Sequence, residues 1–393
     1  MSPLYRGQLL VHGLGFSPDH RTLVAVSIGS NSVSFIDTAT NAVKHITYVG
    51  RAPHEAFFTP DGREVWVSVR GEDYVSVLDA EALRRDRSHS GTQRSRHGHL
   101  FSGRPLWLRV LELHSRDAGH STCAPGAWPV AWRSPSPFCP NIAAAPRGDQ
   151  VWFTLKDVGK VVVFNARPPF NVLREIDTGP ITNHVNFALT DQGQLAYVTV
   201  GGLNQVQVFR TDTFERIATI PTGPLPHGIW PSGDGTRMYV GIENGDAVSA
   251  IDTKLQQVVA TIPTGQAAQA VVYVPNAVPR GDGRANLQPL GVATMATHLR
   301  LSAPGAADDA TSVALFDQGL TQILQAGVTG LAPKAAYVLA LADNPQGNPP
   351  LEELAAFSTN PAGAAVVDCG RSDPPGRRAR RAVAAPLSRD RAQ

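Results

Sequence analysis

The sequence predicts an all-β protein made of repeated four-stranded units, and two observations on residues 12–274 carry this prediction. A unit of about 42 residues recurs, because the residues that open successive units stand 42, 86, 44, 43 and 42 positions apart. Within each unit, short runs alternate apolar with small or polar side chains and end at Gly, Pro, Asn or Asp, which is typical of strands and hairpin turns. Four strands in about 40 to 45 residues indicate a β-propeller blade. The opening residues are His12, His54, Pro140, His184, His227 and Gln269.

The second unit shows each element in order. Pro53-His54-Glu55 opens the first strand, and Asp61-Gly62 supplies the hairpin conformation that most other residues resist. Residues 65–68 and 75–79 form the second and third strands, and a weaker fourth strand ends at a Pro/Gly turn. A helical solenoid would need ten-residue stretches at helical spacing. Residues 1–277 hold none of convincing length, so the repeats are predicted to be blades.

The second strand of the units carries a recurring motif, which reads Tyr-Val-Thr-Val at residues 197–200 and has variants at 66–68, 152–154 and 239–241. This motif resembles the YVTN-family β-propellers, which are similar to the quinoprotein amine dehydrogenase-like propellers. The resemblance covers residues 12–277 apart from one irregular stretch. It implies a bacterial protein that is periplasmic or secreted. It implies little about activity, because propellers host catalysis, ligand capture and protein docking alike.

The predicted propeller spans residues 1–277 and has seven blades, with an incomplete ring as the alternative. Six units account for six blades. Residues 270–275 form a half-unit, which is expected to pair with residues 8–11 as a composite seventh blade. Such closure removes the open strand edges that invite aggregation.

Residues 84–136 interrupt the repeat. Residues 84–134 carry nine Arg, no Lys and three acidic residues, and they lack the turn and third-strand patterns of the other units. The distance from His54 to Pro140, 86 residues, still equals two unit lengths, which argues against an insertion. We interpret the stretch as a blade read in a shifted frame. The alternative is a basic arm for nucleic acid or anionic lipid, but such arms usually mix Lys with Arg and space aromatic residues for stacking, so nucleic acid is not the favoured partner.

A second domain is predicted after a linker at residues 278–288. Residues 289–368 read as strands without the 42-residue period, and they are expected to form a small β-sandwich-like domain. Within it, Leu331-Ala332-Pro333 followed by Tyr337 resembles the tyrosine corner of fibronectin-type sandwiches, where the hydroxyl bonds back to the backbone. Residues 369–393 carry seven Arg and no Lys and are predicted to be a disordered tail.

Composition excludes several classes of protein. Apolar residues make up 42% of the chain, and no run of 18 apolar residues exists, so no membrane span is predicted. No signal peptide precedes the first strand as the sequence is written, which places the protein in the cytoplasm if Met1 is the true start. Three cysteines give neither a disulfide framework nor a metal-binding pair.

Recurring acidic residues are predicted to be structural. Asp37, Asp79 and Asp252 follow the third strand of their units, where an Asp side chain caps a turn through the backbone. No nucleophile elbow, zinc-protease, phosphate-loop or dinucleotide motif stands in the sequence. No catalytic residue is therefore predicted.

The candidate site consists of residues at the start of first strands. First strands line the axial channel of a propeller, so their side chains are expected to converge on one opening. Converging imidazoles suit a borderline metal ion or a haem-like ligand, although repetition of the motif alone would also explain them. The ligand and channel candidates are His12, His54, Glu55, Asn141, His184, Asn186 and His227. The predicted metal set is His54, His184 and His227.

Two functions remain open at this stage. The favoured one is a non-enzymatic binding or scaffold propeller that recognises a protein partner or a small ligand through its loop face and axial channel, without a specified cofactor. The alternative is a redox enzyme subunit, or a propeller that binds a metal or cofactor through the axial His set.

Overall fold

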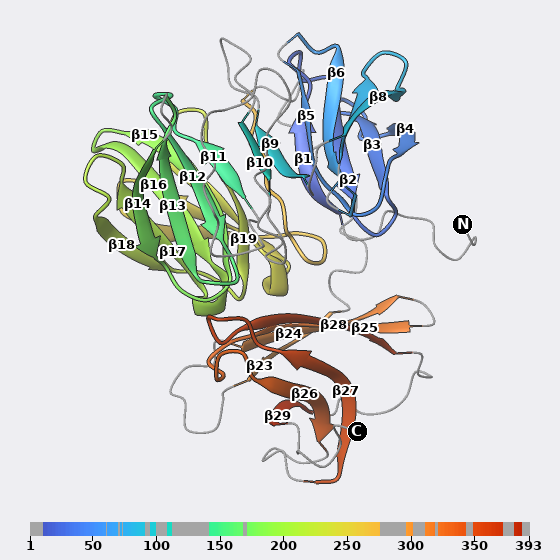
Figure 1. Cartoon of the computed structure of the whole chain (residues 1–393), viewed down its shortest axis with the longest axis vertical. Helices are drawn as coiled ribbons and strands as arrows, with labels where there is room; N and C mark the ends of the chain where they lie inside the picture. Colours follow the sequence, from blue (N-terminus) through green and yellow to red (C-terminus); the bar gives the residue numbers. More distant parts are fainter. Residues whose placement is uncertain are drawn as a thin grey trace.

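The computed structural model describes residues 11–59, 61–69, 71–72, 74–90, 95–99, 108–111, 141–167, 171–275, 296–301, 311–318, 321–342, 349–371 and 381–386. Figure 1 shows a group of twisted sheets above, coloured blue to yellow, and a smaller β-body below, coloured orange and red. In the described part of the chain, helical structure is limited to two 3-10 turns, η1 (Gly201–Leu203) and η2 (Glu243–Gly245). None of the described helices is long and apolar enough to span a membrane.

Five antiparallel four-stranded sheets form the blades of the described propeller, and within each sheet the strands lie in sequence order. This order follows from the hairpins, because a tight turn places each strand beside the one before it. The first two sheets consist of β1 (Val11–Phe16), β2 (Thr22–Ser27), β3 (Ser32–Asp37) and β4 (Val43–Tyr48), and of β5 (Pro53–Phe58), β6 (Glu64–Val69), β7 (Tyr74–Asp79) and β8 (Arg84–Ser90). The third consists of β11 (Ile142–Ala144), β12 (Gln150–Leu155), β13 (Lys160–Asn165) and β14 (Val172–Asp177). The last two consist of β15 (Thr182–Thr190), β16 (Gly193–Val200), β17 (Gln205–Arg210) and β18 (Arg216–Pro221), and of β19 (Pro226–Pro231), β20 (Arg237–Ile242), β21 (Ala247–Asp252) and β22 (Gln257–Pro263).

The blades bury apolar side chains against each other. Tyr197 on β16 and Met238 on β20 are fully buried in one cluster between neighbouring sheets. Trp152 on β12 is also fully buried, and its ring meets Phe187 on β15 edge-on at a centroid distance of 5.8 Å. Each large apolar side chain that is buried contributes about 1.5 to 3 kcal/mol, so the faces between blades hold the ring together.

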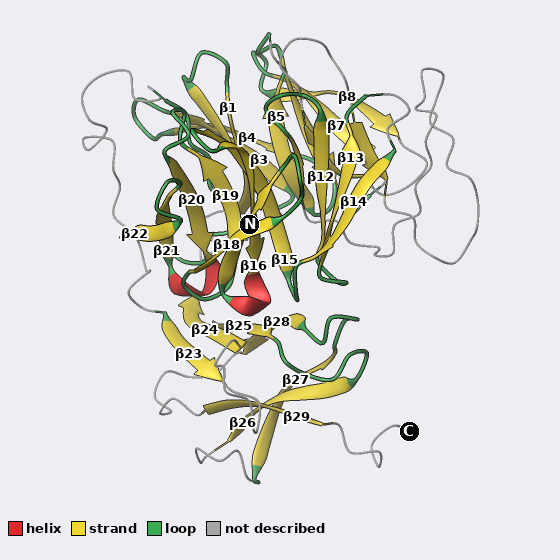
Figure 2. Ribbon diagram, turned by 90° about the vertical axis from the view of Figure 1, so that its left-hand side faces the viewer, coloured by secondary structure: helices red, strands yellow, loops and turns green. Residues whose placement is uncertain are grey.

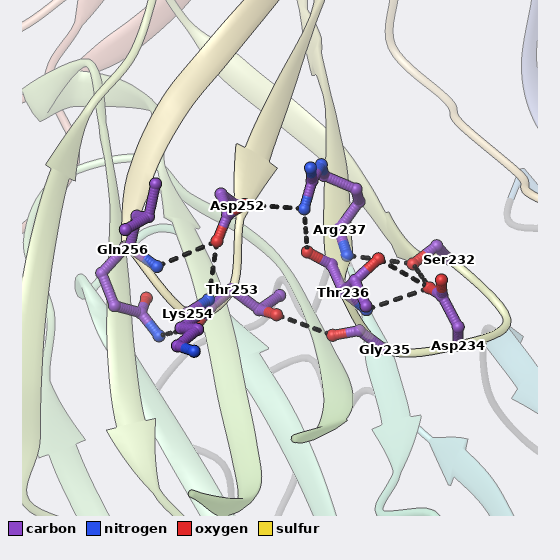
Figure 3. Close-up of polar contacts among 10 residues, drawn as sticks. Ser232, Asp234, Gly235, Thr236, Arg237, Asp252, Thr253, Lys254 and Gln256 are labelled. Atoms are coloured by element: carbon purple, nitrogen blue, oxygen red, sulfur yellow. Dashed lines mark hydrogen bonds and ion pairs between the residues drawn. The ribbon is translucent and has the colours of Figure 1, made fainter. Parts of the chain in front are cut away.

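Acidic residues hold the turns, as the sequence predicted. Asp234 accepts a hydrogen bond of 3.0 Å from the backbone N–H of Thr236, across Gly235 with its positive φ of 70° (Figure 3). Asp252 accepts one of 2.9 Å from the N–H of Leu255. Equivalent contacts recur at Asp37 and Asp79. The predicted turn role of these third-strand aspartates is therefore confirmed.

The irregular stretch contains more regular structure than its composition indicated. β8 completes the second blade from its first residue onward, with Arg84 opposite Asp79. Two further strands, β9 (Ser95–His99) and β10 (Leu108–Leu111), pair with each other. The remainder of residues 84–136 lies outside the described residues, and the shifted reading frame stays a prediction.

The composite seventh blade is not formed by the described residues. Residues 270–275 form no strand, and residues 8–10 lie outside the described part of the chain. The segment still follows the inner edge of the last blade, because the N–H of Gly228 donates to the carbonyl of Gln269 at 2.9 Å and Tyr273 stacks on Tyr239 at 5.6 Å.

The C-terminal domain is a β-sandwich, as predicted. One sheet has the order β23, β24, β25, β28, and the other has the order β27, β26, β29. The inward faces share a core that includes Val313, Leu324 and Leu339. The strands are β23 (Thr297–Leu301), β24 (Thr311–Gln318), β25 (Thr321–Val328), β26 (Ala336–Ala342), β27 (Leu351–Ser358), β28 (Ala365–Arg371) and β29 (Arg381–Pro386).

Two details of this domain test the sequence predictions. The Tyr337 hydroxyl accepts a hydrogen bond of 3.1 Å from the N–H of Ala332, so the predicted tyrosine corner is confirmed. The predicted disorder of residues 369–393 is wrong for two segments, because β28 continues to Arg371 and β29 pairs with β26. β29 reads Ala-Val-Ala-Ala after Arg381, and this short run of small apolar residues pairs with β26 despite its Arg-rich surroundings.

The sandwich docks against the end of the propeller that carries η1 and η2, directly above β24 and β25 in Figure 2. Asn244 in η2 donates a hydrogen bond of 2.9 Å to the Ser312 hydroxyl on β24. A small apolar cluster of Ile181, Leu225 and Ala364 joins the two domains. The domains therefore meet through both polar and apolar contacts.

Candidate functional site

Each of the four candidate histidines lies at an irregularity in the first strand of its blade. The pairing of β1 with β2 skips from Val11 to Leu14, and the equivalent interruption occurs in β5, β15 and β19. An interruption of this kind turns side chains away from the positions that a regular ladder would give them. The four imidazoles accordingly leave the blade faces and meet near the axis.

The imidazoles form one buried cluster. His12 lies 3.8 Å from His54 and 5.3 Å from His227 between ring centroids, and His184 lies 5.0 Å from His227. Their exposed fractions are 2% for His12 and His54, 8% for His184 and 6% for His227. The convergence that the sequence predicted is thus present.

Two buried carboxylates stand behind the cluster. Glu243 places Oε2 at 2.7 Å from Nδ1 of His227, and its Oε1 accepts a hydrogen bond of 2.6 Å from Gln269. Glu55 places Oε1 at 3.3 Å from Nδ1 of His12 and at 3.6 Å from Nδ1 of His54. Each carboxylate thus lies on the Nδ1 side of its histidine partners.

The pKa values of the Glu243 and His227 pair reflect their burial and their contact. Burial lowers the pKa of His227, and the attraction of Glu243 offsets this only in part. Burial alone would raise the pKa of Glu243, but its contacts with His227, Lys156 and Gln269 outweigh this and hold the pKa at about 2. The geometry places Nδ1 of His227 against the carboxylate, which accepts the Nδ1 proton, so Nε2 is the ring nitrogen directed away from Glu243.

A cavity of about 400 Å³ lies between this end of the propeller and the sandwich. His12, His54 and His227 line its propeller side, while Gln325 and Val366 line its sandwich side. Among the described residues, the charged side chains of the lining are one lysine and three acidic residues: Lys156, Asp157, Glu243 and Asp368. Asp368 stays exposed to solvent. Partial removal from water raises its pKa, and the nearby carboxylate of Glu243 adds to the rise. The cavity is therefore rich in carboxyl groups and imidazoles.

The two predicted asparagines connect blades. The Asn141 side chain accepts a hydrogen bond of 3.0 Å from the N–H of Val185, and the Asn186 side chain donates one of 3.1 Å to the carbonyl of Ile229. Neither asparagine belongs to the lining of the cavity. Their observed contacts fix the spacing of the first strands.

The structure alters the predicted metal set. One ligand atom each from His12, His184 and His227 lie within 4.8 Å of one another, and His12, His54 and Glu55 form a second such group. His12 thus takes the place that the sequence prediction gave to His54 in the three-imidazole group. The rings of His54 and His12 lie 3.8 Å apart between centroids at a tilt of 35°, so His54 packs on His12, whereas the three imidazoles within ligand distance of one another are those of His12, His184 and His227.

Sequence reasoning missed two kinds of supporting residue. Glu243 directly follows a second strand, where other units carry Ile28, Lys156 and Gly201, so this variable position gave no signal in the repeat. Thr154 and Thr199 accept the N–H of Asn141 and of His184 and so support the irregular strands. Their signal was the Ser or Thr that recurs in the second-strand motif.

Comparison with known proteins supports the fold alone. No known protein family matches the chain, and no curated protein sequence matches it. Among solved structures, the dihydro-haem d1 dehydrogenase NirN in complex with DHE is similar, with 14% identity, a TM-score of 0.50, and coverage of 93% of this chain and 69% of that chain. Hydrazine synthase of Kuenenia stuttgartiensis gives 16% identity, a TM-score of 0.48, and coverage of 69% of this chain and 92% of that chain. The β-propeller domain of Cps50 (Swd1) from Myceliophteria thermophila gives 11% identity, a TM-score of 0.46, and coverage of 67% of this chain and 90% of that chain.

The repeated radial sheets define the class of this protein. It is an all-β protein with a β-propeller and a C-terminal β-sandwich, and a cluster of buried imidazoles lies beside the cavity between them. At identities this low, the similar structures carry no information on activity.

Proposed function

We propose that this chain is a non-enzymatic binding protein that captures a small cation in the cavity between its propeller and its sandwich. The observation that carries the proposal is the lining of that cavity, which among the described residues brings together three acidic residues, one lysine and three imidazoles. The volume of about 400 Å³ falls within the usual range of small-ligand pockets.

Electrostatics favour a cation over an anion at this place. Clefts lined by charges of one sign with low-dielectric walls concentrate ions of the opposite sign. Asp368 and Glu243 repel each other, as the raised pKa of Asp368 reflects in part. A bound cation would relieve this repulsion.

Thermal unfolding of the chelator-treated full chain tests the proposal. Zn²⁺ and the organic dication 1,4-diaminobutane serve as cationic probes, and acetate serves as the anionic probe. We expect at least one cation to raise the unfolding temperature and acetate to have no effect, because a ligand that binds only the folded state stabilises it.

A cavity-filling variant locates the effect. Val366→Trp adds a large ring to the cavity lining, whereas Val259→Trp makes the same change on outer strand β22; these valines are 37% and 45% exposed. Stabilisation by the cation should vanish in Val366→Trp and persist in Val259→Trp. Absence of stabilisation by either cation, or equal stabilisation in both variants, would contradict the proposal.

A redox subunit or cofactor carrier is the second candidate, and the axial imidazoles are the observation that favours it. The similar NirN structure is a complex with DHE, but its likeness to this chain extends to the fold alone. The absorption spectrum of the purified protein separates the two candidates. A visible band that is lost in His227→Gln would support the second, and a spectrum without such a band would leave the cation-binding proposal as the better one.

Membership of the YVTN family, a bacterial origin and a periplasmic location belong to the same proposal. They are supported by the Tyr-Val-Thr-Val motif at residues 197–200 and its variants. The nucleotide sequence upstream of Met1 tests the location: an in-frame signal sequence is expected, and its absence would contradict export. Recognition of a protein partner through the loop face stays a prediction.

A further inference from the structure

We infer that His12, His184 and His227 bind one divalent transition metal ion beside the axial cavity, and that Glu243 orients His227 for this purpose. The inference identifies the cation of the proposed function as a transition metal ion. It depends on the proposed function only because both use the same cavity. Three blades supply the ligands, so the metal would also connect strands β1, β15 and β19.

The distances fit a site that closes slightly on its ion. One nitrogen of each imidazole lies within 4.8 Å of the others. Zinc-to-imidazole bonds of about 2.0 to 2.1 Å in a tetrahedron place the nitrogens roughly 3.3 Å apart. Small side-chain rotations toward the centre of the cluster can supply this contraction.

Ring orientation favours this group over the second one. The lone pair of an imidazole nitrogen lies in the plane of its ring, so rings that meet edge-on can direct lone pairs at a common point. His227 is steeply inclined to both partners, at 77° to His12 and 89° to His184. His54 instead lies against His12 at a tilt of 35°, with 3.8 Å between centroids, so it is a packing partner of that ring.

Glu243 acts as a positioning residue. Its Oε2 lies 2.7 Å from Nδ1 of His227, so Nε2 is the nitrogen that His227 can offer to a metal. Metal-binding histidines characteristically donate their other N–H to a carboxylate, which fixes the tautomer and the ring orientation. Gln269 holds the second oxygen of Glu243 at 2.6 Å and so keeps the carboxylate in place.

The ligand chemistry selects the ion. Imidazoles suit zinc, copper, nickel and iron, whereas magnesium and calcium prefer oxygen ligands. Three protein ligands leave a further coordination position, and two of the three histidines line the cavity. The open position would therefore be accessible to a water molecule or a small ligand in the cavity.

Titration calorimetry with Zn²⁺ on the chelator-treated full chain, with metal analysis of the dialysed product, tests the inference. We expect one Zn²⁺ per chain, not displaced by excess Mg²⁺. Glu243→Gln should weaken Zn²⁺ binding by about 10- to 100-fold, as loss of an orienting partner does, and His184→Gln and His227→Gln should weaken it further. His45→Gln, at an exposed position on outer strand β4, is the matched control and should leave binding unchanged.

Each outcome decides for or against the inference. No Zn²⁺ binding by the wild-type chain overturns it without reference to any variant, so a misfolded variant cannot obscure the result. An equal loss of Zn²⁺ affinity in His45→Gln and His184→Gln overturns it as well. A loss of Zn²⁺ affinity in Glu55→Gln alone also overturns it and would favour the group that contains His54. If 1,4-diaminobutane still stabilises the chain while Zn²⁺ does not bind, the metal inference fails and the proposed function stands; if neither cation binds, both fail.

Discussion

The hydroxyl of Thr199 donates a hydrogen bond of 2.6 Å to the backbone carbonyl of His227 in the next blade. The same oxygen accepts the N–H of His184 at 2.9 Å in its own blade. A single buried hydroxyl therefore connects two neighbouring histidines of the cluster through their backbones. The recurring Thr of the second-strand motif fixes the spacing between first strands.

Replacement of this hydroxyl should destabilise the propeller. Thr199→Val leaves a buried N–H and a buried carbonyl without their partner, at an expected cost of about 1 to 3 kcal/mol. Chemical denaturation of the full chain measures the change in the free energy of unfolding. Thr219→Val, an exposed position on β18, should change it by no more than about 0.5 kcal/mol. Equal effects of the two substitutions would rule out this role of Thr199.

The buried Tyr197 predicts a loss of stability at alkaline pH. Burial raises its pKa to about 12, although the hydrogen bond from Gln256 acts in the opposite direction. In the unfolded chain the phenol ionises near pH 10, so between about pH 10 and 12 the folded state holds a proton that the unfolded state has lost. This contribution to stability is complete below pH 10 and falls by about 1.4 kcal/mol per pH unit above it.

Denaturation of the wild type and Tyr197→Phe over this pH range measures the effect. The variant lacks the ionising group, so its stability should fall less steeply than that of the wild type. If the unfolding free energies of wild type and Tyr197→Phe change in parallel with pH, the pKa of Tyr197 is the same in the folded and the unfolded chain, which contradicts this prediction.

The contact between Asn244 and Ser312 should couple the two domains. A double-mutant cycle with Asn244→Ala and Ser312→Ala should give an interaction free energy of about 0.5 to 3 kcal/mol, since the two side chains share a buried hydrogen bond. Thr311→Ala provides the control pair, because its hydroxyl bonds to Thr329 within the sandwich. An interaction free energy for Asn244 with Ser312 no larger than that of the control pair would argue against docking through this contact.

A second contact between the domains should depend on pH. Nε2 of His298 lies 3.0 Å from Asp246, and this hydrogen bond raises the pKa of His298. The stabilisation is therefore complete below the ordinary histidine pKa of about 6.5 and is lost as the pH rises through the raised value. The difference in unfolding free energy between wild type and His298→Gln should shrink from about pH 6 to about pH 9. A difference that stays constant over this pH range would mean that protonation of His298 is not coupled to the docking of the two domains.

Much of the fold was predictable because the repeat carries local information. Turn residues such as Asp252 and the second-strand motif recur in each unit, so a single period predicted blades, strand order and the convergence of first strands. The tyrosine corner at Tyr337 was predictable for the same reason, since its partner Ala332 lies five residues away.

The supporting contacts of the site could not be predicted in this way. Glu243 stands at a variable position of the repeat, and its contact with Gln269 joins it to the segment that follows its own blade. Asp368 reaches the cavity from another domain. The strand β29 was missed because its four small apolar residues stand in an arginine-rich stretch and are recognisable as a strand only through their pairing with β26. Contacts between distant segments decide each of these features.

The location of a bound metal tests the central claim most directly. Crystals of the full chain grown with Zn²⁺ and measured at the zinc absorption edge should show one anomalous peak about 2.0 to 2.1 Å from a nitrogen of His12, His184 and His227. The peak should lie at the edge of the cavity between propeller and sandwich. A zinc peak only elsewhere on the chain, or no peak among these three imidazoles at saturating Zn²⁺, would contradict the account.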